Sequence, residues 1–174
     1  MRICPPFRGC KPKDITQGFS SAHQAIDFAA PYGTFLVAPE DCRISAVRTA
    51  EVVNDKTEEL ARGYGVFMEA ENRRYGYWHC LPMFPVEVGQ FVKQGEIVGQ
   101  MGNSGFVLSG GKYVPIEIRT KAPYHGTHVH YSMAIDNKSV NPLDFIDYSI
   151  PINYDVLTAI KAIAQRMLNL LKNK

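Results

Sequence analysis

The segment from Thr127 to Ile135 alternates strictly between two kinds of side chain. Val129, Tyr131, Met133 and Ile135 fall at one set of positions, and His128, His130, Ser132 and Ala134 fall at the other. Successive side chains on a β-strand point to opposite faces, so this pattern predicts a half-buried strand. Both histidines leave the face that points away from the core. The chain must therefore form a sheet that presents two neighbouring imidazoles.

Further short β-type runs recur between residues 19 and 146. The runs are Thr34–Ala38, Arg43–Val47, Val66–Ala70 and Tyr75–His79, and turn signals fall at Pro31–Gly33, Gly63–Gly65 and Gly89–Gln90. Many short strands with frequent turns are typical of antiparallel sheets. We therefore predict a mainly β fold, an antiparallel β-sandwich or barrel.

Four of the five histidines, together with one aspartate, have the spacing of a metal site. His23 precedes Asp27 by four residues, His79 stands alone, and His128 and His130 lie two apart. Zinc binds neutral imidazole nitrogen and carboxylate oxygen, and a catalytic zinc site typically has three protein ligands and one open position. His23, Asp27 and His130 can supply the three. The alternative for each histidine taken alone is an ordinary surface or core residue.

Length, charge and cysteine content narrow the function classes. The 174 residues suit one domain with enough apolar content for a real core. The net charge of +2 comes from dispersed basic residues, so we expect no nucleic-acid partner, whereas an anionic polymer such as a cell wall is compatible. The cysteines lack CxxC spacing and are expected to be reduced structural thiols: Cys4, Cys10, Cys42 and Cys80.

Signals for secretion and membrane insertion are missing from the sequence. The opening residues Met1–Arg8 lack the apolar run of a secretory signal, and no apolar stretch reaches the roughly 20 residues of a membrane span. We therefore expect a protein that is made and kept in the cytosol and has no transmembrane segment.

Residues 106–126 form the irregular part of the sequence. Glycines at Gly110 and Gly111 are followed by a strand-like stretch from Tyr113 to Arg119 and by the turn Pro123–Gly126. Next to the two-histidine strand, such an insert would lie at the mouth of a site, as a lid or a substrate-contacting hairpin, or it is a solvated loop. His125, in its final turn, is expected to be an ordinary histidine.

The last part of the chain changes to a helical period. After Pro151, with Asn153 as the expected cap, apolar residues recur at spacings of four and three: Val156, Ile160, Ile163, Met167 and Leu170. The polar positions include Lys161, Arg166, Lys172 and Lys174. We expect this amphipathic helix to pack on its own barrel and the protein to be a monomer. Contact with another subunit or with a membrane surface is the alternative.

Several motifs, in a fixed order, resemble one enzyme family. They are Ile15–Phe19, His23–Asp27, Ala30–Thr34 with Val37–Ala38, Gly63–Gly65, Tyr77–Leu81, Val88–Gly99 ending in Gly102–Gly105, His128–His130 and Val140–Pro142. In this order they resemble the motifs of lysostaphin-type, or LytM-like, zinc metalloendopeptidases, which cut the peptides of bacterial peptidoglycan. The resemblance covers about Ile15 to Ile146. It implies a duplicated hybrid-motif barrel and divides the chain into an N-terminal extension (1–14), a zinc endopeptidase domain (15–150) and a C-terminal helix (151–174).

Three features depart from the family pattern. Ala25 replaces the usual glycine of the metal motif, Cys42-Arg43 occupies a common Asp-Gly turn, and the segment between Gly105 and His128 is longer than usual. None of these removes a ligand. A degenerate, non-catalytic member would be expected to have lost ligands.

The resemblance also implies roles for the five candidate site residues. Zinc is expected on His23, Asp27 and His130, with a water in the open position as nucleophile. His79 and His128 are the expected catalytic imidazoles. One orients or deprotonates the water, and the other hydrogen-bonds the developing oxyanion.

Two non-hydrolytic functions are alternatives to the peptidase hypothesis. The hairpin Val92–Ile97 also resembles lipoyl and biotinyl carrier domains, but no exposed lysine in a methionine-flanked turn accompanies it. A carrier or a wall-binding, regulatory barrel is therefore the alternative. A phosphocarrier with two facing histidines would leave His23 and Asp27 without a role.

An extracellular substrate combined with the lack of a leader suggests a phage origin. The protein would then be an endolysin released through a membrane hole or a virion-associated wall-drilling enzyme. A processed secreted protein that works in the periplasm or outside the cell is the alternative.

Overall fold

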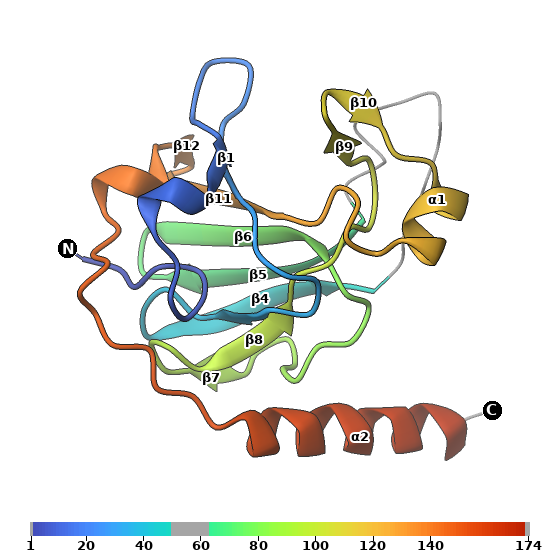
Figure 1. Ribbon diagram of the computed structural model, residues 1–174. Coiled ribbons are helices and arrows are strands. Elements are labelled where there is room, and N and C mark those ends of the chain that lie inside the picture. The colour runs from blue at the N-terminus through green and yellow to red at the C-terminus, as the bar shows by residue number, and fades with distance from the viewer. Residues whose placement is uncertain (1, 50–62, 173–174) are drawn as a thin grey trace.

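The computed structural model describes residues 2–49 and 63–172, and Lys174 and the side chain of Leu170 lie outside the described residues. Its elements are, in order, η1 (Pro12–Asp14), β1 (Ile15–Gln17), β2 (Ile26–Phe28), β3 (Phe35–Val37), β4 (Cys42–Arg48), β5 (Tyr64–Ala70), β6 (Arg73–Cys80), β7 (Phe91–Val92), β8 (Ile97–Gln100), β9 (Leu108–Ser109), β10 (Lys112–Tyr113), α1 (Ile116–Lys121), β11 (Val129–Ile135), β12 (Lys138–Ser139), η3 (Pro142–Asp144) and α2 (Val156–Lys172). The predicted mainly β fold with one C-terminal helix is confirmed (Figure 1).

One large antiparallel sheet contains most of the strands. Its strands follow the order β1-β2-β11-β6-β5-β4-β7, and β12 pairs with the far end of β11. Two small sheets, β3-β8 and β9-β10, complete the fold. The sheet order brings β2 and β6 to either side of β11, so residues far apart in sequence become neighbours at its centre.

The hydrophobic core lies between the inner face of the large sheet and the β3-β8 pair. Tyr75, Tyr77 and Tyr131 point inward from β6 and β11 and are almost fully buried. The N-terminal segment also contributes, because Ile3 is fully buried and its amide donates to the carbonyl of Phe145. The outer face of the same strands is left for polar side chains, as the alternation in the sequence predicts.

Five of the strands predicted from hydrophobic pattern are present, with ends within two residues of those expected. The four predicted runs coincide with β3, β4, β5 and β6, and the two-histidine segment coincides with β11. Strong period-two alternation over a half-buried sheet explains this agreement.

The predicted strand from Tyr113 to Arg119 is wrong. The hairpin β9-β10 ends at Tyr113, and Pro115 directly precedes the short helix α1. Proline has no N–H to donate to a strand ladder but is tolerated at the start of a helix, where that donor would be unpaired. The apparent alternation is also reversed relative to burial, because Ile118 is 49% exposed and Arg119 only 3% exposed.

Helix α2 packs on the barrel through a narrower face than its sequence predicts. Ala159 and Ile152 join a small buried cluster with Val37, Ile97 and Cys4. Ile160 and Met167 of the predicted buried stripe are each 51% exposed.

The N-terminal cap of helix α2 is Asp155 and not the predicted Asn153. The carboxylate of Asp155 accepts hydrogen bonds from the amides of Leu157 and Thr158. Among the described residues, no helix has the length and hydropathy needed to cross a membrane.

Candidate metal centre

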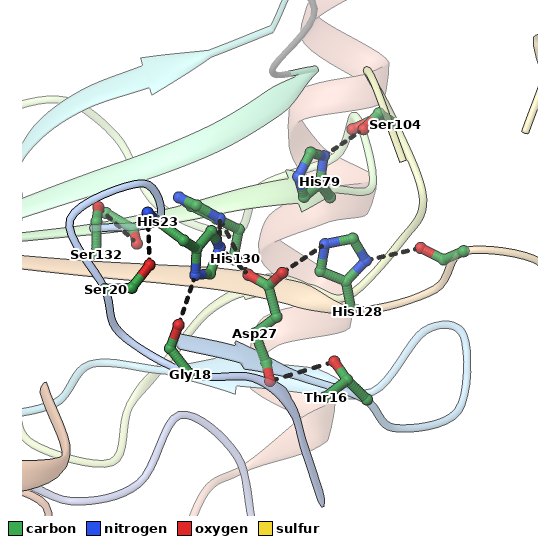
Figure 2. Close-up of polar contacts among 12 residues, drawn as sticks. Thr16, Gly18, Ser20, His23, Asp27, His79, Ser104, His128, His130 and Ser132 are labelled. Atoms are coloured by element: carbon green, nitrogen blue, oxygen red, sulfur yellow. Dashed lines mark hydrogen bonds and ion pairs between the residues drawn. The ribbon is translucent and has the colours of Figure 1, made fainter. Parts of the chain in front are cut away.

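The three predicted ligands meet on the outer face of the large sheet. Asp27 of β2 lies directly opposite His130 of β11 in the register, so both side chains leave the same face. His23 reaches the same point from the loop before β2 (Figure 2). His23 Nε2 lies 3.1 Å from His130 Nδ1 and 3.1 Å from Asp27 Oδ1, and His130 Nδ1 lies 3.0 Å from Asp27 Oδ1.

The spacing and chemistry of these three atoms fit a zinc ion. Ligand atoms about 2.0–2.1 Å from a tetrahedral zinc lie about 3.3 Å from one another. The three distances of 3.0–3.1 Å are close to this value. Two nitrogens and one carboxylate oxygen are also a donor set that zinc accepts. Within the part of the chain that the structure describes, His23, Asp27 and His130 are the group of side chains whose ligand atoms converge in this way.

The ligand orientation of His23 is fixed by the loop that carries it. Its Nδ1 lies 3.0 Å from the carbonyl of Gly18, so Nδ1 carries the proton and Nε2 keeps its lone pair for a ligand. The amide of His23 donates to the hydroxyl of Ser20, and the two residues also exchange backbone hydrogen bonds. This turn holds the imidazole against the sheet.

The carboxyl group of Asp27 is held in its charged form. Its burial would raise its pKa, but the hydrogen bond to His130 and the nearby imidazoles of His128, His130 and His23 outweigh burial and lower the pKa below its ordinary value. Asp27 therefore supplies an anionic oxygen at any pH near neutrality.

His79 reaches the site through an irregularity in β6. Strand alternation would turn His79 to the face opposite Trp78. The β5–β6 register, however, advances by one residue on β5, from Gly65 to Tyr64, and by two on β6, from Trp78 to Cys80. His79 is the extra residue of this bulge and has a positive φ of 61°. Bulges of this kind re-aim a side chain next to functional sites. Here the bulge brings the His79 and His128 rings to a centroid distance of 4.6 Å.

Both of these imidazoles present a free nitrogen toward the ligand group. His79 Nδ1 lies 2.7 Å from the carbonyl of Ser104, and His128 Nδ1 lies 2.8 Å from the carbonyl of Gly126. A carbonyl only accepts, so each Nδ1 is protonated and each Nε2 has a lone pair. His128 Nε2 lies 3.7 Å from Asp27 Oδ2 (Figure 2).

Burial keeps both imidazoles neutral. It lowers the pKa of His79 to about 3, with a further contribution from the neighbouring His128. Burial also lowers the pKa of His128, although the charge of Asp27 opposes the shift. Neutral imidazoles with free lone pairs can accept protons, which is the property that general bases need.

Three supporting residues were not found from the sequence. The Asn103 side chain donates to the carbonyls of Pro123 and His125, at 3.0 and 3.1 Å, and Arg119 donates to the Asn103 carbonyl at 2.5 Å. The next residue, Ser104, supplies the carbonyl that orients His79. The insert 106–126 therefore braces the loop that holds His79. The segment Gly102–Gly105 was recognised as part of a family motif, but nothing in its sequence assigned a role to the side chain of Asn103 or to the carbonyl of Ser104.

Comparisons with known proteins agree on one family. A family model described as Peptidase family M23 matches residues 21–142. An uncharacterized metalloprotease of Haemophilus influenzae is 30% identical over 145 residues, which are 82% of this chain and 24% of that protein. The chain thus spans about a quarter of the length of this curated relative.

Solved structures show the same fold. Helicobacter pylori Csd3 is similar over 99% of this chain and 42% of its own, with a TM-score of 0.61 and 20% identity. A zinc-containing peptidase of Vibrio cholerae is similar over 82% of this chain and 40% of its own, with a TM-score of 0.57 and 20% identity. At these identities the likeness concerns the fold alone. The family match confirms the resemblance indicated by the motifs.

Proposed function

Because the chain belongs to peptidase family M23, we propose that it is a zinc-dependent endopeptidase that cleaves the stem or cross-bridge peptides of bacterial peptidoglycan. One observation carries the proposal: His23, Asp27 and His130 place three ligand atoms within 3.0–3.1 Å of one another, beside two neutral imidazoles. The peptidoglycan substrate comes from the motif resemblance.

We assign the five site residues to two tasks. His23, Asp27 and His130 would hold the metal, which when bound supplies Lewis-acid polarisation of the scissile carbonyl and lowers the pKa of water. His128 and His79 would manage protons. His128, closer to the carboxylate of Asp27, accepts a proton at Nε2 from the attacking water. His79 would help to orient that water through the lone pair on its own Nε2, and it would donate to the oxyanion that develops on the substrate only after taking up the proton that the neighbouring His128 has accepted.

The carrier alternative has less support. The lysine of the carrier-like hairpin, Lys93, lies 2.8 Å from Asp41 in an exposed ion pair. A carrier would also give no task to the converging ligand group. The site of action is the cell wall under the proposed function, and the phage origin stays a prediction.

The test is hydrolysis of purified cell walls by zinc-loaded protein. We expect new free amino groups to appear, and their identification shows which peptide bond is cut. The matched control is His130→Ala, which is expected to release none. Zinc-loaded wild-type protein that releases no amino groups from walls of several cross-link types would contradict the proposal.

A further inference from the structure

A groove on the outer face of the sheet continues from the metal centre. It is a cavity of about 410 Å³ whose lining includes His23 and His130 of the ligand group and also Arg74. The register gives the length of this groove. His130 lies opposite Trp78, Ser132 opposite Gly76, and Ala134 opposite Arg74. Arg74 is therefore four residues from the end that carries the ligands, or about 13 Å along the strand.

The floor of the groove is low at its middle because Gly76 has no side chain. A Cβ at this position would lie 2.7 Å from Ser132 Oγ and 3.1 Å from the ring of Phe67. Phe67 and Trp78 form a T-shaped pair with ring centroids 4.6 Å apart. The backbone of a bound peptide could thus approach the sheet closely, with aromatic surface on one side.

Arg73 and Arg74 are neighbours with opposite environments. Arg73 points to the inner side of β6, where Glu40 binds its guanidinium through two hydrogen bonds of 2.6 and 2.9 Å. Arg74 points outward and is exposed, and within the described ranges 2–49 and 63–172 no hydrogen bond or ion pair engages its side chain. Glu69 is its cross-strand neighbour on β5 but forms no ion pair with it among the described residues. The guanidinium of Arg74 is available to a ligand in the groove.

We propose that Arg74 binds a carboxylate of the substrate, two to four residues from the scissile bond. An extended peptide spans about 3.3–3.6 Å per residue, and the arginine side chain reaches several ångströms back along the groove, which gives this range. Guanidinium and carboxylate groups form paired, charge-assisted hydrogen bonds. The substrate class is therefore an acidic peptide. This inference rests on the proposed peptidase function, and it names the feature of the substrate that the groove selects.

The experiment uses a series of peptides that carry one carboxylate at successive distances on either side of the scissile bond, each matched by its carboxamide. For wild-type protein, kcat/KM should be about tenfold or more higher for the carboxylate form at one or two of these distances. Arg74→Gln should lose this preference and hydrolyse both forms at the lower rate, and Arg74→Lys should retain part of it. Zinc content should not change. The matched control is Arg43→Gln, because Arg43 lies in the same cross-strand row but donates to the carbonyl of Gly89.

A binding measurement separates failure of this inference from failure of the proposed function. Trp78, the single tryptophan of the chain, lies in the groove, so its fluorescence reports occupancy. The subsite is supported, even without hydrolysis, by two results together. Wild-type protein should bind the carboxylate form of a peptide more tightly than the carboxamide form, and Arg74→Gln should bind the two forms with equal affinity. Equal binding and equal hydrolysis of both forms by wild-type protein would overturn it while leaving the peptidase function in place.

Discussion

The metal centre and helix α2 differ in place and in how they are held. The ligand residues lie on the outer face of the large sheet, whereas α2 packs against the β3-β8 pair and is drawn below it in Figure 1. In the metal centre, three of the four imidazoles are fixed twice, by their place on a strand or tight loop and by a hydrogen bond from the ring to a backbone carbonyl; they are those of His23, His79 and His128. Helix α2 is held by few contacts, chiefly the buried Ala159 and an ion pair between Arg166 and Glu87 at 3.0 Å. Leu157, Leu168 and Leu171 on it are more than half exposed. The candidate site residues therefore lie on the part of the molecule whose geometry is most constrained, the large sheet and the tight loop before β2.

The largest expected effect separates the two histidines of β11. His130→Ala should abolish zinc binding and activity together, because it removes a ligand atom. His128→Ala should keep zinc, while turnover falls by roughly 10²–10⁴-fold, because it removes a proton acceptor. Elemental analysis and single-turnover kinetics on both variants provide the measurement. Equal zinc loss in both variants would show that His128 also binds the metal.

The second prediction concerns the whole of helix α2. A chain that ends after Ile150 loses Ile152 and Ala159, which cover Val37 and Ile97. We expect the free energy of unfolding to fall by about 3 kcal/mol, with a tendency to aggregate. Denaturant unfolding gives the value. A truncated protein with unchanged stability, zinc content and activity on wall fragments, but no lysis of intact cells, would show that the helix serves targeting or a partner.

A matched pair of substitutions tests which face of α2 packs. Ala159 is 5% exposed and Ala164 is exposed, so the same change to glutamate should act differently at the two positions. Ala159→Glu buries a charge and is expected to lower the free energy of unfolding by about 2 kcal/mol, whereas Ala164→Glu should change it by less than about 0.5 kcal/mol. Thermal unfolding compares the two variants. Similar destabilisation by both would mean that the outer face is also covered.

The smallest expected effect comes from the brace behind His79. Asn103→Ala removes two hydrogen bonds that hold the loop supplying the Ser104 carbonyl. We expect kcat to fall about tenfold, because hydrogen bonds that contribute about 1–1.5 kcal/mol to holding His79 in place are lost. The zinc content should not change. Asn72→Ala is the control, because Asn72 bonds Asp136 in an exposed turn away from the site. If the two variants behave alike, the insert does not position His79.

The sequence predicted those parts of the molecule in which the pattern and the burial agree. The alternation of β11 identified the strand and placed His128 and His130 on the outer face, and the structure adds that Asp27 lies directly opposite His130. The bulge that turns His79 to the site depends on a register between distant strands, which no local pattern records. The prediction of a strand at Tyr113–Arg119 was wrong for two reasons. Pro115 precedes a helix, and the apolar Ile118 is exposed whereas the charged Arg119 is buried, which is the opposite of what the alternation predicts. The helix was found by its period, but its packing face depends on the barrel surface that it meets.

The zinc content of purified wild-type protein tests the central claim most directly. After dialysis without chelator, elemental analysis should find about one zinc per chain, held by His23, Asp27 and His130. A protein without zinc that also takes up none on titration would contradict the account. The convergence of these three side chains would then have no metal to explain it, and the non-hydrolytic barrel would be the better interpretation.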